Sequence, residues 1–171
     1  MKTLVMGLGN VLMGDDGFGP FVVKVLESRY DFPGEVSLLD VGTPGLDLVP
    51  FLTGPEAVVI VDTVKAEAPP GTLKRYGREA ILRHLPEARL SPHDPSLKEV
   101  LLTLDFAGKG PREVTLVGTV PASVAAGPGL SAPVRAAVEA AVEAVRVELE
   151  RLGVPARPKA EPGDPDLWWE R

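Results

Sequence analysis

The sequence predicts an α/β fold, a three-layer α/β/α sandwich whose twisted, mainly parallel sheet has five strands. Apolar runs of strand length alternate along the 171 residues with stretches in which apolar residues recur at helical spacing. Residues 57–61 form the most continuous apolar run, and their β-branched side chains are typical of a central strand covered on both faces. Alternating strands and helices predict a parallel sheet with right-handed crossovers and a helical layer on each side.

In the first third of the chain, three strands and two helices are expected. In order they are a strand over 3–6, a helix over 18–26, a strand over 36–39, a short helix over 46–52 and a strand over 57–61. The helix over 18–26 carries apolar residues three and four positions apart, which gives it one apolar face. Gly7 ends the first strand, while Asp40 and Asp62 follow the second and third.

The rest of the chain predicts two more strands and two longer helices. The expected elements are a strand over 73–76, a helix over 95–106, a strand over 114–117 and an amphipathic helix over 134–152. Pro133 near the start of the last helix and Gly153 just past its end are typical helix boundaries. The direction of the strand over 73–76 is undecided because its alternation is weak.

Residues 1–154 are expected to form a single α/β domain, because a chain of this size buries enough surface for one stable core. Residues 155–171 are proline-rich and have no periodic pattern, so they are interpreted as a tail. Adjacent exposed indoles would be an unusual surface. We therefore expect Trp168 and Trp169 to anchor the tail against the body or a neighbouring chain.

Composition excludes several classes of function. The chain has no cysteine, which rules out disulfides, thiolate zinc sites and a cysteine nucleophile. A net charge of −6 without clustered Lys and Arg argues against nucleic-acid binding. No apolar run approaches the ~20 residues that span a bilayer. The first residues end their apolar stretch too early for a signal peptide, so a cytoplasmic protein without membrane contact is expected.

The most informative segment is residues 7–19, GLGNVLMGDDGFG, which lies between the first strand and the first helix. One interpretation is a dinucleotide loop, with Asp40 as the acidic residue at the end of the second strand. However, Leu12 stands where the third glycine belongs, and Asp15 and Asp16 occupy the helix start. A carboxylate ~4 Å from a phosphate repels it by about 4 kcal/mol at an effective dielectric of 20. A helix start attracts an anion by only about 0.3–1 kcal/mol, so no nucleotide cofactor is expected.

A second interpretation is that residues 5–10, VMGLGN, resemble the opening of the peptidyl-tRNA hydrolases, which are also small α/β enzymes. That family continues with a Pro-Gly turn and soon a catalytic histidine. Here neither follows, the first histidine is His84, and the protein is acidic where an RNA substrate favours basic residues.

A third interpretation is that the N-terminal segment and four further motifs resemble the hydrogenase maturation endopeptidases. The first is the Gly-x-Gly-Asn segment followed by an acidic pair before Gly17; the others are residues 39–43 and 58–63, residues 91–93, and residues 116–121. Together they cover roughly residues 2–152 in the family's order. The resemblance implies a phosphorylase/hydrolase-like fold and an endopeptidase that removes the C-terminal tail of a nickel-loaded [NiFe]-hydrogenase large-subunit precursor.

The resemblance, placed on the predicted fold, indicates a site at the ends of the first and third strands. Asp16, Asp62 and His93 are predicted to bind nickel supplied by the substrate, and zinc or cadmium could substitute. Asp16 and Asp62 are also the predicted catalytic residues, either through metal-activated water or as a carboxylate general base. Asp40 and Thr43 are predicted to bind substrate.

Each of these residues also has a purely structural interpretation. An aspartate at the helix start can be an N-cap, and Asp15 is the predicted cap. Asp62 can be a turn former, His93 an ordinary loop residue, and His84 is treated as structural. Asp40 and Thr43 can serve the turn around Gly42. At the level of function, a non-catalytic nickel-sensing module for the same precursor is the alternative from another class.

Overall fold

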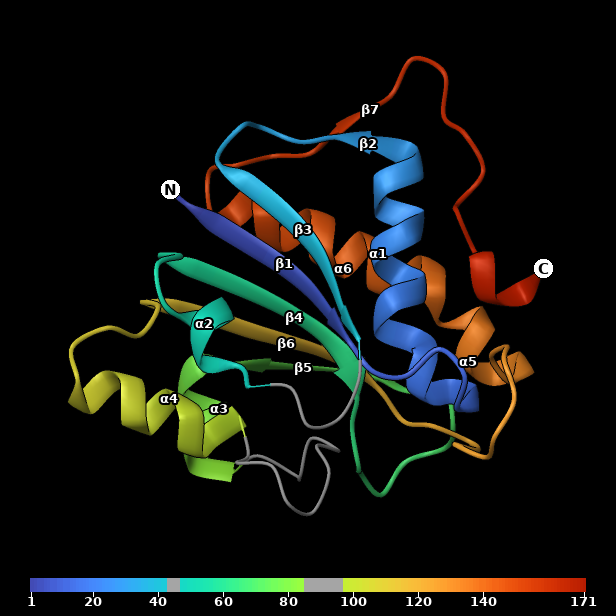
Figure 1. Cartoon of the computed structure of the whole chain (residues 1–171), viewed down its shortest axis with the longest axis horizontal. Coiled ribbons are helices and arrows are strands. Elements are labelled where there is room, and N and C mark those ends of the chain that lie inside the picture. The colour runs from blue at the N-terminus through green and yellow to red at the C-terminus, as the bar shows by residue number, and fades with distance from the viewer. Residues whose placement is uncertain (43–46, 85–96) are drawn as a thin grey trace.

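The computed structural model of the chain describes residues 1–42, 47–84 and 97–171 and confirms the α/β fold (Figure 1). The main sheet has five strands in the order β3-β1-β4-β6-β5. The strands are β1 (Thr3–Leu8), β3 (Val36–Gly42), β4 (Ala57–Thr63), β5 (Leu73–Gly77) and β6 (Glu113–Thr119). All neighbouring pairs are parallel except β5 and β6, which settles the direction that the sequence left undecided.

Helices cover both faces of this sheet, as Figure 1 shows. On one face lie α1 (Phe18–Arg29), α5 (Ala132–Ala136) and α6 (Val138–Arg151). On the other lie α2 (Val49–Leu52), α3 (Arg78–His84) and α4 (Leu97–Phe106). None of the helices in the described ranges is long and apolar enough to cross a membrane.

The alternation of side chains along the strands divides the core into two clusters, one on each face. In β1, Val5 packs with α1 and α6, whereas Leu4 and Met6 pack with α2 and α4. Every residue of β4 is buried, because this strand lies at the centre of the sheet under both helical layers. The prediction of a doubly covered central strand is confirmed, although β4 extends through Asp62, which the sequence placed just past its end.

The final helix differs from the expected single helix. It is divided into α5 and α6 at Ala137, which keeps helical backbone angles (φ −80°, ψ −12°). The backbone N–H of Ala137 donates to the carbonyl of Val134, three residues back, so the turn is locally tightened. Downstream, α6 buries one stripe of its surface in the core cluster beneath α1.

The segment after α6 is attached to the body at several points. The short strand β7 (Arg157–Pro158) pairs antiparallel with β2 (Tyr30–Asp31), which directly follows α1. The chain then runs to the short 3-10 helix η2 (Trp168–Glu170). Trp169 is only 6% exposed and meets the ring of Phe21 edge-on with centroids 6.5 Å apart, so it confirms the expected anchor. Trp168 instead remains 53% exposed.

Candidate functional site

The parallel strands bring their carboxyl ends to one edge of the sheet, where the predicted site residues were expected. β1 and β4 are neighbours, with Gly7 paired to Val61. β1 continues through residues 9–13 into the short 3-10 helix η1 (Gly14–Gly17), which carries Asp16 and leads directly into α1. Asp62 is the last residue but one of the neighbouring strand β4. The edge at which open α/β sheets bind ligands therefore carries both carboxylates.

Close backbone packing fixes the position of η1 against these two strands. A Cβ on Gly19, in the first turn of α1, would lie 2.3 Å from the carbonyl oxygen of Val61 and 2.4 Å from that of Leu8. A Cβ on Gly9, where φ is +131°, would lie 1.8 Å from the carbonyl oxygen of Asp16. No side chain fits at either position, so glycine is required for η1 to approach the sheet.

Asp62 is the most perturbed acidic group at this edge. Its side chain is 3% exposed, and Oδ1 accepts a hydrogen bond of 2.7 Å from the backbone N–H of Thr63. Burial raises the pKa of Asp62 well above its ordinary value. The hydrogen bond from Thr63 opposes this shift, and the negative charge of Asp16 adds to it. A carboxylate in this environment is stabilised by any cation that binds beside it.

Asp16 is partly buried and lies close enough to Asp62 for its charge to act on that group. Its Oδ2 accepts a hydrogen bond of 2.8 Å from the backbone N–H of Asn10, which holds the carboxylate over the loop that follows β1. The structure thus brings together two of the three predicted metal ligands, which lie 46 positions apart in the chain.

Two of the predicted site residues lie outside the described ranges. His93 and Thr43 belong to the segments that the structure does not describe, so their predicted roles stay predictions. Within residues 1–42, 47–84 and 97–171, no group of three or more acidic or histidine side chains is placed to hold a metal. A complete three-ligand site therefore needs a residue such as His93 in addition to Asp16 and Asp62.

Asp40 lies in β3 beside Gly7 of β1, at the same edge of the sheet. Desolvation raises the pKa of its carboxyl group, against the opposing charge of Lys24 and a hydrogen bond from the backbone of Gly42. Asp40 borders a hollow of about 190 Å³ that is also lined by Gly9, Asn10, Val11, Leu12, Gly42 and Trp168. No sequence pattern predicted that Trp168 would lie next to the predicted site.

Asp15 is not the helix cap that the sequence predicted, because neither η1 nor α1 has a side-chain cap hydrogen bond. Its buried carboxylate instead accepts hydrogen bonds from the loop after β6. The donors are the backbone N–H groups of Ala122 (2.8 Å), Ser123 (3.1 Å) and Ser131 (2.7 Å) and the hydroxyl of Ser131 (2.8 Å). Desolvation raises the pKa of Asp15, but these hydrogen bonds outweigh it and the net pKa is lowered.

Backbone hydrogen bonds reinforce this attachment of two loops. The N–H of Gly14 donates to the carbonyl oxygen of Gly127 (2.8 Å), and the N–H of Gly127 donates to the carbonyl oxygen of Leu12 (2.8 Å). The loop 120–131 therefore supports the segment that carries Asp16. Sequence reasoning missed this loop, because its partners are more than 100 positions away from Asp15.

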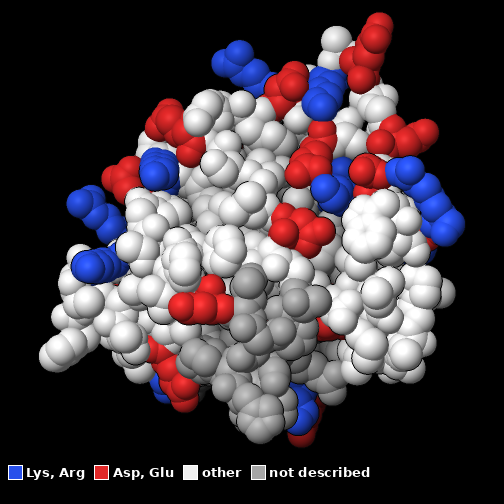
Figure 2. All heavy atoms as spheres, viewed as in Figure 1, with Lys and Arg blue, Asp and Glu red and all other residues white. Residues whose placement is uncertain are grey.

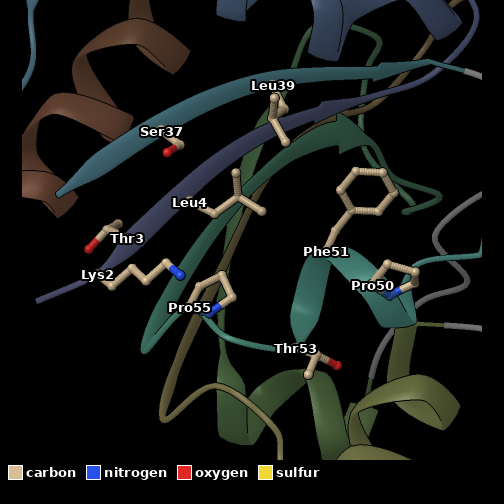
Figure 3. Close-up of a pocket in the computed structure, with 9 residues that line it drawn as sticks. All are labelled: Lys2, Thr3, Leu4, Ser37, Leu39, Pro50, Phe51, Thr53 and Pro55. Carbon is tan, nitrogen blue, oxygen red and sulfur yellow. The ribbon is translucent and has the colours of Figure 1, made fainter. Parts of the chain in front are cut away.

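A second hollow, also of about 190 Å³, lies between β1, β3 and α2, away from Asp16 and Asp62 (Figure 3). Figure 3 shows its lining residues: Lys2, Thr3, Leu4, Ser37, Leu39, Pro50, Phe51, Thr53 and Pro55. Lys2 is the one ionisable side chain among them, and no carboxylate or imidazole is present. This hollow lacks groups for metal binding or acid–base chemistry, so the carboxyl edge is the better candidate site.

Comparison with known proteins gives a consistent family match. The model of the family HycI, described as hydrogenase maturation protease, matches residues 20–148. The Hydrogenase 2 maturation protease of Escherichia coli (strain K12) is 36% identical over 160 residues, which cover 93% of this chain and 97% of that protein. The hydrogenase expression/formation protein HupM of Azotobacter chroococcum mcd 1 is 38% identical over 159 residues, covering 92% and 76% of the two chains.

The folds agree as well. The solved structure of the hydrogenase maturating endopeptidase HybD from E. coli superposes with a TM-score of 0.83 at 35% identity, covering 94% of this chain and 99% of that one. The hydrogenase 2 maturation peptidase from Thaumarchaeota archaeon SCGC_AB-539-E09 superposes with a TM-score of 0.66 at 38% identity, covering 90% and 99%. The similarity therefore extends over nearly the whole length of both proteins.

Proposed function

Because the chain belongs to the hydrogenase maturation protease family, we propose that it is an endopeptidase that removes the C-terminal propeptide of a nickel-loaded [NiFe]-hydrogenase large-subunit precursor. In this proposal the nickel ion arrives with the substrate and serves as the signal that the precursor is ready. The matching family consists of hydrogenase maturation proteases, which rules against the peptidyl-tRNA hydrolase alternative.

The observation that carries the proposal is the proximity of Asp16, in η1, to Asp62, near the end of β4, at one edge of the sheet. A cation is favoured beside the almost fully buried carboxylate of Asp62, because burial and the negative charge of Asp16 both oppose the ionisation of Asp62. Oxygen donors with an imidazole fit nickel and also zinc or cadmium. His93 is the proposed third ligand.

The protein side of the chemistry follows from the two carboxylates. A divalent ion at this site supplies Lewis acidity and positive charge. Burial raises the pKa of Asp62 above the ordinary range of a carboxyl group, which suits Asp62 to accept a proton when it is not occupied as a ligand. Asp16 is held by Asn10 and provides the second carboxylate. Asp40 and Thr43 are proposed to orient the precursor's backbone, and the same proposal places the protein in the cytoplasm.

The test is to incubate the purified protein with a nickel-loaded precursor and to follow the precursor by mass spectrometry. The proposal expects a mass loss at the C-terminus that depends on nickel in the precursor. Asp62→Asn and Asp16→Asn should each slow processing by at least a hundredfold. Asp31→Asn, which removes an exposed carboxylate in β2, is the matched control and should process normally.

The same experiment separates the two function classes. A protein that binds the nickel-loaded precursor but leaves its mass unchanged would be a nickel-sensing module and would contradict the proposal. Cleavage of nickel-free precursor at an equal rate would contradict the role of nickel while leaving the protease activity in place.

A further inference from the structure

The hollow beside Asp40 is built from three segments that are far apart in the chain: residues 9–12, residues 40–42 and Trp168. We call it the Trp168 pocket and define it by its four side chains: Val11, Leu12, Asp40 and Trp168. Leu12 is 51% exposed and Trp168 is 53% exposed, so the pocket presents two large apolar groups to solvent. Such a surface on a folded protein is typical of a binding site.

The indole of Trp168 is held in place by its neighbours. It meets the buried ring of Trp169 edge-on, with centroids 5.6 Å apart. In the same short helix, Glu170 accepts a hydrogen bond of 2.6 Å from the guanidinium of Arg135 in α5. A fixed aromatic side chain loses little conformational entropy when a ligand covers it, which favours its use as an anchor in recognition.

The pocket is continuous with the proposed catalytic edge. Asn10 is one of its lining residues and donates its backbone N–H to Asp16. The same loop therefore forms one wall of the pocket and holds a proposed ligand of the substrate's nickel. An extended segment bound in the pocket therefore lies next to the loop that holds Asp16.

Charge indicates what kind of segment fits. Asp40 is the one charged residue among the lining residues of the pocket. Figure 2 shows that most Lys and Arg on this face lie towards its rim, with acidic side chains scattered among uncharged ones. Lys24 in α1 is close enough to Asp40 for its charge to lower the pKa of that carboxyl group, and the lining residues of the pocket include no cation. An apolar side chain with a basic residue next to it complements such a surface.

We propose that the Trp168 pocket is a substrate subsite that binds a large apolar side chain of an extended precursor segment, with an adjacent basic residue facing Asp40. The proposal rests on the proposed function, because it takes the hydrogenase large-subunit precursor as the occupant. It assigns Trp168 and Leu12 to substrate recognition.

Binding is tested with protein that contains 5-fluorotryptophan, because the chain has only two tryptophans and gives two fluorine signals. Adding unlabelled nickel-loaded precursor should shift the signal of Trp168 and leave that of buried Trp169 in place. The absence of a shift at saturating precursor would overturn the proposal. A shift that appears only when the protein's own concentration is raised would also overturn it, because the occupant would then be a second copy.

Kinetics provide the second readout. Trp168→Ala should raise KM for the precursor roughly tenfold and change kcat by less than about twofold, since an interface aromatic contributes to binding. Trp168→Phe should restore most of the affinity. Asp40→Asn should raise KM about threefold, with a smaller effect at high salt. Phe106→Ala is the control, because Phe106 in α4 is 98% exposed and lies outside the pocket.

The outcomes separate this proposal from the function on which it rests. If precursor shifts the Trp168 signal but is never cleaved, the pocket stands and the endopeptidase proposal fails. If the wild-type protein cleaves the precursor and Trp168→Ala does so with unchanged KM, the function stands and the pocket is refuted.

Discussion

The buried carboxylate of Asp15 provides the sharpest test of how the site loop is held. It accepts four hydrogen bonds from Ala122, Ser123 and Ser131, and no water-exposed surface remains on the residue. Substituting Asp15→Ala removes all four at once. Because the loop 120–131 supports the segment that precedes Asp16, we expect both stability and processing to fall.

The magnitude follows from the number and type of these bonds. A hydrogen bond to a charged group contributes about 1.5–3 kcal/mol, but bonds to one acceptor do not add, and the carboxylate's desolvation opposes them. Removing one member of a buried ionic or charge-assisted network typically costs about 3–5 kcal/mol. We expect this loss in the free energy of unfolding for Asp15→Ala, against a total of about 5–15 kcal/mol. Ser131→Ala, which removes only the hydroxyl donor, should cost about 1 kcal/mol.

The lowered pKa of Asp15 also determines how the free energy of unfolding changes with pH. The pKa of Asp15 is lowered in the folded state, so its contribution is fully present above the unfolded-state pKa of about 3.9. It is lost as the pH falls through the folded-state pKa. Urea unfolding of wild type and Asp15→Asn should therefore show a constant difference near pH 7 that shrinks below about pH 4. A loss below about 1 kcal/mol for Asp15→Ala, or a difference that grows in acid, would refute the reasoning.

Four further substitutions test the energetics around the site and the core. Asp62→Asn should raise the free energy of unfolding at pH 7. Burial raises the folded-state pKa of Asp62, so this carboxyl group destabilises the folded protein increasingly as the pH rises above the unfolded-state pKa of about 3.9. The gain should vanish near pH 4, and a less stable variant at pH 7 in urea would contradict it. Thr119→Val should raise the free energy of unfolding by about 1 kcal/mol, because the buried hydroxyl of Thr119 has no hydrogen-bond partner within the described ranges. An unchanged or lower melting temperature in thermal unfolding would disprove this. Glu148→Ala should destabilise by about 3–5 kcal/mol in chemical unfolding, since this buried carboxylate accepts hydrogen bonds from Thr115 (2.7 Å) and Arg151 (2.7 Å). Glu143→Ala breaks an exposed pair with Arg146 and should lower stability far less than Glu148→Ala does. Equal losses for the two variants would contradict the role of burial.

The parallel part of the sheet could be predicted because its strands are continuous apolar runs. Residues 57–61 are all buried in β4, and their β-branched composition alone predicts a strand that is covered on both faces. The direction of β5 depends on its antiparallel register with β6, which no local pattern encodes. The two-residue strands β2 and β7 are too short for a periodic signal.

The site was predictable to the extent that strand ends locate it. Asp16 and Asp62 converge because parallel neighbouring strands end at the same edge, and this follows from topology. The role of Asp15 was not predictable, because local reasoning assigns an aspartate at a helix start to capping, whereas its partners come from residues 122–131. The break at Ala137 also has no sequence signal, since alanine is the strongest helix former.

The convergence of three side chains on one nickel ion is the central claim, and anomalous diffraction tests it most directly. Crystals of the protein soaked in nickel and measured at the nickel absorption edge should show one strong peak. We predict this peak about 2.0–2.2 Å from carboxylate oxygens of Asp16 and Asp62 and from a ring nitrogen of His93. A peak elsewhere, or a nickel ion at this edge with His93 turned away from it, would contradict the account.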